Sequence, residues 1–417
     1  MQDEAAFSEP SAPPPPAPPS PPERAVFTGE DGDFRRMVTK GALLELVTAG
    51  FYRFWLATNI RRHLWSATRL GGDPLEYLGT GRELLFGFFF ALAIFAPISL
   101  GYFLLGVWAE SAQALASLPF GLFFVAFGQF ALYRARRYRL HRTAWRGLRF
   151  GMVGSGWAYA GRAMLWGLAI FASLGLALPW AEVALERYKM RNSFYGELQG
   201  DFVGRGGTLL KRAWWIWLLA LVAFASIMAL SVTAGAAEAK GHAPDPGISG
   251  LLGLAILGLE FVGVFLYGAF KAIQWRWWLE GVRIGALHAT SDLRAWSLIG
   301  NYWKFIGWVV LVVILALIAL AGGGFVLNAT GLVHLDKVFA SAKPPTGFLI
   351  AIGAFYLAFL LAIGVLWRIY FMQRVWKLVV NSLTLHELAS ARDVRAREGS
   401  ADALGEGFVD SLDVVGF

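Results

Sequence analysis

The chain contains no cysteine among its 417 residues, so disulfide bridges, thiolate nucleophiles and thiolate metal sites are excluded. Its six histidines are scattered, and none has a second ligand at the spacing of a metal site. We also find no serine elbow, no pair of catalytic carboxylates and no phosphate-binding glycine loop. We therefore expect no enzyme activity, no metal and no cofactor.

Charge is also scarce, at 16% of residues, whereas soluble domains carry about 25%. Hydrophobic residues make up 57%, and a helix needs about 20 apolar residues to cross a bilayer. Seven apolar windows approach or exceed this length: 84–108, 114–133, 163–183, 213–234, 248–270, 302–327 and 347–370. These windows are typical of a polytopic α-helical membrane protein.

The positive charges predict the orientation of these windows. Only three of the 37 Lys and Arg residues, Lys240, Lys337 and Lys343, fall in the connecting segments that we expect outside the cell. The runs 235–247 and 328–346 are thus expected outside, and both termini in the cytoplasm. The net charge of +8 then reflects the basic residues that orient the spans, so we expect no nucleic acid partner. Anionic lipid headgroups remain candidate partners, and the oligomeric state is open.

One window does not fit this alternation, because 163–183 has arginines on both sides. An internal repeat at an offset of 125 residues offers an explanation. It relates residues 27–86 to residues 152–211 without a gap. The matched pairs include Gly29 with Gly154, Leu43 with Leu168, Gly50 with Gly175, Trp55 with Trp180, Arg62 with Arg187, and Gly79 with Gly204.

Each copy contains an apolar stretch with a small-residue break, a basic helix and a short hairpin. The stretch 43–55 of the first copy includes Glu45 and Arg53, and it is too short and polar to cross a membrane. Its twin at 168–180 should therefore be an elbow that enters one leaflet and returns. We prefer six spans and two elbows, and a seventh span at 163–183 is the alternative.

The expected fold class is an all-α polytopic membrane protein. It has about six transmembrane helices, two re-entrant or interfacial helical elbows, short cytoplasmic β-hairpins and an internal duplication. Residues 1–26 should form a disordered proline-rich arm, because nine of the thirteen residues at positions 10–22 are proline. Residues 27–390 form the membrane domain, and residues 391–417 a cytoplasmic tail.

Three segments carry a resemblance to a known family: FYRFWLATNIRRHLWSATRLGGDPLEYLGTGRELLFG, LGLALPWAEVALERYKMRNSFYGELQGDFVGRG and the ending GEGFVDSLDVVGF. Their order of aromatic break, Arg pair, glycine turn and Gly-x-Gly resembles the YjgN-like family of bacterial inner-membrane proteins. The resemblance extends from about Phe27 to the end. It implies a multi-spanning protein of the bacterial cytoplasmic membrane, and it supplies no substrate and no catalytic residues.

Two sets of residues are candidate sites. Glu260 is the only charge in the window 248–270, and a carboxylate in hydrocarbon must be neutral, paired or in contact with water. Glu260, with Gln129 as a possible polar neighbour, could form a proton or cation site; the alternative is a protonated Glu260 bonded to a neighbouring helix. The basic positions Arg61, Arg62, Arg136, Arg137, Arg187 and Lys189 could bind anionic lipid, or could serve only as positive-inside anchors.

Three function classes follow from these candidates. A small-solute or ion transporter or channel would require a polar cavity that reaches Glu260. A membrane-organising or anionic-lipid-interacting protein without transport activity would use the basic and aromatic inner face. A lipid-modifying enzyme would require an acid–base pair that the sequence does not show. We rank transport first and the membrane-organising role as its alternative.

Overall fold

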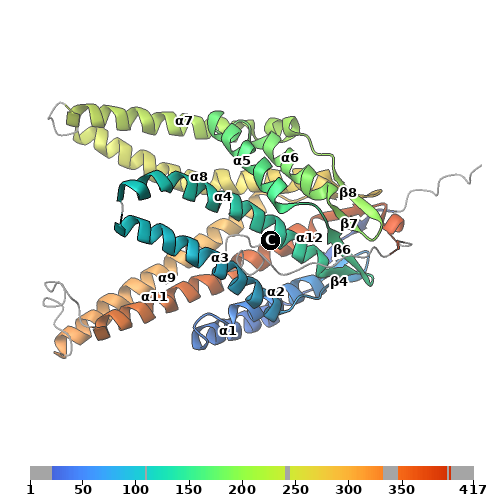
Figure 1. Cartoon of the computed structure of the whole chain (residues 1–417), viewed down its shortest axis with the longest axis horizontal. Coiled ribbons are helices and arrows are strands. Elements are labelled where there is room, and N and C mark those ends of the chain that lie inside the picture. The colour runs from blue at the N-terminus through green and yellow to red at the C-terminus, as the bar shows by residue number, and fades with distance from the viewer. Residues whose placement is uncertain (1–20, 109, 240–244, 332–345, 392–393, 396–417) are drawn as a thin grey trace, which may run out of the picture.

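The computed structural model describes residues 21–108, 110–239, 245–331, 346–391 and 394–395. All the strands lie at one end of the molecule, and the helices extend away from them (Figure 1). The strands of the predicted hairpins are therefore gathered in one place.

The strands form one antiparallel sheet that closes into a barrel. They are β1 (Glu23–Arg24), β2 (Val26–Phe27), β3 (Thr68–Leu70), β4 (Asp73–Tyr77), β5 (Thr143–Trp145), β6 (Leu148–Met152), β7 (Ser193–Tyr195), β8 (Leu198–Phe202), β9 (Val282–Ile284), β10 (Leu287–Ser291) and β11 (Leu383–His386). The order is β1-β11-β10-β9-β8-β7-β6-β5-β4-β3-β2. Only Ala25 separates β1 from β2, so the two edges of the sheet belong to one short stretch of chain.

The interior of the barrel is filled with side chains. Trp145, Tyr195 and Leu385 from the strands pack with Leu388 and Ala391, which lie in a 3-10 turn after β11. The Tyr195 hydroxyl donates a hydrogen bond to the carbonyl oxygen of Trp145 at 2.9 Å. The barrel is therefore a packed core in the part of the chain that is described, as expected for a barrel of modest strand number.

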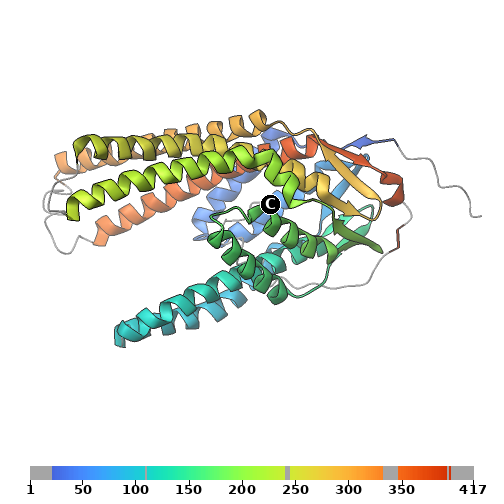
Figure 2. The ribbon, with the colours of Figure 1, turned by 90° about the horizontal axis from the view of Figure 1, so that it is seen from above.

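The helices alternate with the hairpins and form five pairs in the described part. The short pairs are α1 (Asp31–Val47) with α2 (Arg53–Ser66), and α5 (Gly156–Ala172) with α6 (Leu178–Arg191). The long helices are α3 (Gly81–Trp108), α4 (Glu110–His141), α7 (Gly206–Ala239), α8 (Pro246–Gly281), α9 (Ala295–Ala329) and α11 (Thr346–Leu366), which continues through the π-helix η1 (Trp367–Met372) into α12 (Gln373–Asn381). The pair α3–α4 diverges from the other long helices with distance from the barrel (Figure 2).

Six helices among the described residues are long and apolar enough to cross a membrane: Gly81–Trp108, Leu115–His141, Gly206–Thr233, Pro246–Gly281, Ala295–Val326 and Thr346–Asn381. This agrees with the six predicted spans. The window 163–183 is not among them, because it is divided between α5 and α6.

The turns of the two short pairs are built by the same hydrogen bonds. Thr48 Oγ1 donates to the carbonyl of Leu44 at 2.7 Å and accepts from the amide of Tyr52 at 2.9 Å. Ser173 makes the same two bonds, with Ala169 at 2.7 Å and Ala177 at 2.9 Å. Gly50 and Gly175, both with a φ of 89°, then reverse the chain.

The bounds of the two units also agree. Helices α1 and α2 and strands β3 and β4 begin and end 125 positions before α5, α6, β7 and β8. The hydroxyl residues and glycines at the predicted break are thus the local cause of the elbow geometry, because only glycine adopts a φ near +90° without strain.

A buried ion pair attaches the first elbow to the last long helix. The Arg368 guanidinium donates to both carboxylate oxygens of Glu45, at 3.0 and 3.2 Å. The Glu45 side chain is 3% exposed. The polar character of Glu45, which argued against a span at 43–55, is therefore satisfied by a partner from the other end of the sequence.

The predicted fold class is confirmed in part. The described chain is largely helical, with six candidate spans, and its hairpins pair with one another in one eleven-stranded sheet. Of the predicted proline-rich arm, residues 1–20 lie outside the described part, and residues 23–26 belong to β1 and β2. Of the predicted tail, Ala391 is buried in the barrel, and residues 396–417 lie outside the described part.

The topology can be tested with single cysteines, because the natural chain has none. Ala158 and Glu197 are exposed positions on either side of the second elbow. We expect A158C and E197C to react with a membrane-impermeant thiol reagent only from the cytoplasmic side. A329C, at the far end of α9, should react only from the other side. Labelling of A158C and E197C from opposite sides would restore a seventh span.

The barrel turn at Gly196 should not tolerate a side chain. A Cβ there would lie 2.4 Å from the carbonyl oxygen of Arg395, and the φ of Gly196 is +53°. We expect G196A to cost about 1–2 kcal/mol from the backbone conformation alone, measured by thermal unfolding in detergent. G207A is the matched control, because a Cβ there meets nothing within 4 Å. Equal stability of the two variants would contradict this packing.

Candidate functional site

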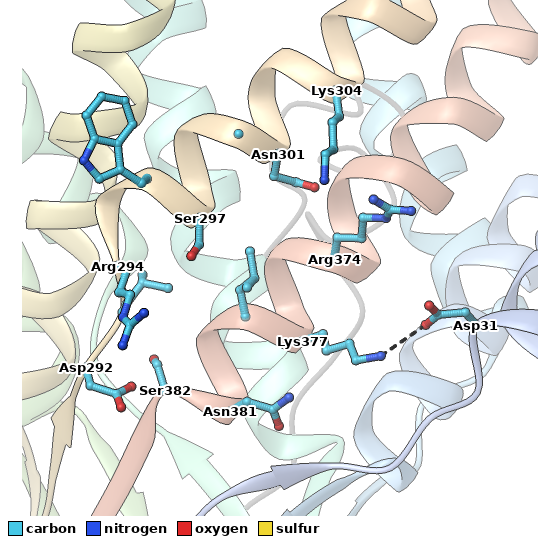
Figure 3. A pocket seen from close by; sticks show the side chains of 14 residues that line it. Asp31, Asp292, Arg294, Ser297, Asn301, Lys304, Arg374, Lys377, Asn381 and Ser382 are labelled. Carbon is cyan, nitrogen blue, oxygen red and sulfur yellow. Dashed lines mark ion pairs between the residues drawn. The ribbon is translucent and has the colours of Figure 1, made fainter.

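A pocket of about 710 Å³ opens at the junction between the helices and the barrel. Its walls come from the start of α9, from α12 and from the first residue of α1, Asp31. Figure 3 shows the side chains that line it. Asp292 follows β10 and Ser382 precedes β11, so the floor of the pocket is the end of two paired strands.

Positive charge dominates the pocket. Its lining includes the cations Arg294, Lys304, Arg374 and Lys377 and the acids Asp31 and Asp292. Both acids are already paired, since Asp31 lies 3.6 Å from Lys377 and Asp292 lies 3.2 Å from Arg24. Within the described residues, Arg294, Lys304 and Arg374 have no carboxylate partner. The pocket therefore has cations available for an anion.

Asn301 adds a polar group that lacks a partner. Its side chain lines the pocket, the residue is 4% exposed, and its Nδ2 makes no hydrogen bond to the described chain. A buried donor without an acceptor costs about 1–3 kcal/mol. The side chains of Asn301 and Lys304 from α9 and of Arg374 from α12 converge on the same part of the pocket (Figure 3).

Helical spacing explains why these residues share a wall. Ser297, Asn301 and Lys304 lie at i, i+4 and i+7 on α9, and Arg374, Lys377 and Asn381 lie at i, i+3 and i+7 across α12. The π-helix η1 precedes α12 and holds Arg368 on the first elbow. Such π-helical turns are frequent at functional sites.

Sequence reasoning missed this pocket. A signal was present, since Lys304 lies inside the apolar window 302–327 and shares a helix face with Asn301 and Ser297. In the sequence, a cation near the start of an apolar window was interpreted only as the charged end of a membrane span. The partners on α12 are about 70 residues away in the chain, so local pattern alone could not show that the two faces meet.

The predicted intramembrane pair is not assembled by the described part of the structure. Glu260 lies in α8, and its side chain is outside the described residues. Gln129 lies half-buried in α4, and no hydrogen bond or ion pair to described residues of α8 is present. The proton or cation site at Glu260 therefore stays a prediction.

Three of the predicted lipid-binding arginines contact the protein's own barrel. Arg61 donates to the Tyr77 hydroxyl at 3.3 Å, Arg62 to the carbonyl of Gly79 at 3.0 Å, and Arg187 to the carbonyl of Phe202 at 3.3 Å. These bonds hold α2 and α6 against the ends of β4 and β8. They are structural contacts, and lipid contact at these positions is untested.

Arg136 and Lys189 instead share a buried carboxylate. Glu186 on α6 lies 3.5 Å from the Arg136 guanidinium and also accepts from Lys189. Burial alone would raise the pKa of Glu186, but Lys189 and Arg136 outweigh it and lower that pKa. Arg137 lies one position after Arg136, half-buried, and its Nε has no partner within the described chain.

One turn earlier on α6, Glu182 has a different environment. Burial raises the pKa of Glu182, and the nearby Glu186 carboxylate raises it further. The cations Lys189 and Lys271, and a hydrogen bond from Gln274 of α8, oppose this change. The second elbow thus carries one ionised and paired carboxylate and one carboxylate that favours its neutral form more than usual.

Comparison with known protein families gives one match. Residues 22–410 match the model of the family described as "Bacterial protein of unknown function (DUF898)". No curated protein and no solved structure matches the chain.

The Glu186 cluster can be tested by removing its charge. E186Q leaves Arg136 and Lys189 without a carboxylate in a buried setting, and breaking such a cluster costs about 3–5 kcal/mol. We expect a clear fall in the thermal unfolding temperature in detergent. E76Q, on the exposed face of β4, is the matched control and should change the stability by less than about 0.5 kcal/mol. A stability of E186Q equal to that of E76Q would show that the cluster is dispensable.

Proposed function

We propose that the chain, which belongs to the DUF898 family of bacterial proteins of unknown function, is a membrane-organising protein that binds anionic lipid at the inner leaflet. The family match, over residues 22–410, covers most of the region that resembles the YjgN-like proteins and confirms that resemblance. The chain is an integral membrane protein by its six apolar helices.

We propose that it resides in the bacterial inner membrane, with the barrel and both termini in the cytoplasm. Support comes from the charge distribution. The cations Arg139, Arg212, Arg276 and Lys304 lie on the barrel-proximal parts of four long helices, whereas Lys240, Lys337 and Lys343 are the few cations of the distal connections. The positive-inside rule then assigns the barrel end to the cytoplasm.

The observation that carries the proposal is the pair of short elbows with exposed apolar tips. Val47 and Phe171 are each 83% exposed, and they occupy matching ends of α1 and α5. Helices of 17 and 14 residues, at about 1.5 Å per residue, are too short to cross a bilayer. Because the elbows and the six long helices leave the same end of the barrel, their apolar tips would enter the inner leaflet only.

Each elbow pairs such a tip with basic helices near the barrel. This combination of an apolar wedge and a cationic base favours anionic lipid, since each Lys or Arg near a membrane surface contributes about 1 kcal/mol. We propose that the two elbows are copies of one duplicated unit and that they anchor and order lipid on two sides of the barrel.

Transport has less support from the geometry. It needs a polar path that continues through the protein, and the barrel interior within the described chain is filled by Trp145, Tyr195 and Leu388. Its main residue, Glu260, has a side chain outside the described part. We therefore place the lipid-binding role first, and we propose no enzyme activity.

Lipid retention tests the proposal. The full chain is purified in mild detergent, equilibrated with equal amounts of phosphatidylglycerol and phosphatidylethanolamine, and analysed by native mass spectrometry. We expect a several-fold enrichment of phosphatidylglycerol, which falls as salt is raised because surface attraction is screened. Equal retention of the two lipids at low salt would contradict the proposal.

A further inference from the structure

We propose that the pocket between α9, α12 and α1 is a specific site for a phosphate ester, and that Asn301, Lys304 and Arg374 contact the phosphate. This inference deepens the proposed lipid-binding function and rests on it for the membrane setting. The shared chemistry is a phosphate monoester or diester. It could belong to a lipid headgroup or to a soluble phosphorylated compound.

The pocket has a surplus of positive charge. Lys377 is engaged with Asp31, and Asp292 with Arg24, so neither acid is available to Arg294, Lys304 or Arg374. Arginine and lysine are complementary ligands for phosphate, because the guanidinium offers two parallel donors and the ammonium a compact charge. Cations drawn together without a counter-charge repel one another, and an anion between them removes that repulsion.

The Asn301 amide favours the same ligand independently of charge. Its Nδ2 is a donor with no acceptor among the described residues, although the residue is almost fully buried. Figure 3 shows the oxygen end of the Asn301 amide directed toward Lys304. With the amide turned over, Nδ2 would face the same point, and a phosphate oxygen between Lys304 and Arg374 would supply its acceptor. A neutral donor beside two cations also favours an anion with several oxygens over a single-atom anion.

The junctions between barrel and helix that are equivalent to this one carry other residues. Helices α3, α7 and α9 each follow a hairpin of the barrel, and they begin at Gly81, Gly206 and Ala295. Counted from these starts, the position of Asn301 corresponds to Gly87 and Arg212, and the position of Lys304 to Phe90 and Trp215.

These counterparts could not form the same site. Arg212 is bound to Glu280 at 2.9 Å, and Phe90 and Trp215 carry no charge. Among the three equivalent junctions, the combination of a buried amide and a lysine without a carboxylate partner in the described chain occurs at the start of α9, where the pocket lies.

The location fits a ligand near the membrane surface. Lys304 lies nine residues after the start of α9, or about 14 Å along the helix from the barrel. Trp296 lines the same pocket and is 74% exposed. Exposed tryptophan is enriched at the level of lipid headgroups, where an apolar ring meets water.

The test compares K304Q, R374Q and N301D with K211Q. Lys211 is an exposed cation on α7 outside the pocket, so K211Q removes the same charge elsewhere. N301D keeps the shape of the side chain and introduces an anion. Folding of each variant is checked by its thermal unfolding temperature and by gel filtration of the full chain in detergent.

Two binding arms separate the sources of phosphate. In the first, sn-glycerol 3-phosphate and inorganic phosphate are titrated calorimetrically; in the second, phosphatidylglycerol binding is measured in nanodiscs against neutral diacylglycerol. We expect K304Q, R374Q and N301D to weaken binding at least about tenfold relative to K211Q in one arm or both, as loss of a charge-assisted hydrogen bond requires. Loss in the lipid arm alone indicates a headgroup, and loss in the soluble arm identifies a free phosphorylated compound.

The pocket proposal and the proposed function can fail separately. If the wild type prefers phosphatidylglycerol and the pocket variants bind like K211Q in both arms, the pocket proposal is wrong while the lipid role stands. If the wild type shows no preference for anionic lipid but binds soluble phosphate through the pocket, the lipid role is wrong and the site stands. Absence of binding by the wild type in both arms overturns the pocket proposal.

Discussion

Closure of the sheet by residues 23–27 is the constraint on which the rest of the structure depends. An open sheet of this kind would leave two edges with unpaired backbone groups. Here β1 pairs with β11 while β2 pairs with β3, and the Phe27 amide donates to Asn381 Oδ1 at 2.8 Å. One short segment therefore joins regions more than 300 residues apart in the chain, and every hairpin obtains two neighbours.

Closure also determines how the helices are arranged. Each hairpin enters and leaves the barrel at the same end, so all the helices must stand on that end (Figure 1). Helix length then decides depth: the long pairs can cross a bilayer, and the short pairs cannot. Polar groups near the bases are satisfied by partners on adjacent pairs, as Glu45 is by Arg368 and Glu186 by Arg136. The apolar tips remain exposed for lipid.

Strand pairing also determines which helix faces form the pocket. Ser297, Asn301 and Lys304 form one helix face, and Arg374 and Lys377 form another. The two faces meet because β10 and β11, which adjoin α9 and α12, pair in register from His288–His386 to Ser291–Leu383. A ligand site between the membrane helices is thus a consequence of strand pairing outside them.

Local patterns were enough to predict the membrane class, the six spans, the elbow breaks at Gly50 and Gly175 and the positions of the hairpins, because hydrophobic length, helix-stopping residues and turn residues act locally. The folded chain was needed to show that the hairpins form one barrel, that Arg62 and Arg187 bind carbonyls at the ends of its strands, and that Lys304 and Arg374 line one pocket. These features depend on which distant segments pair and in which register. That choice is made by the packing and hydrogen bonding of the whole chain, which no local pattern records.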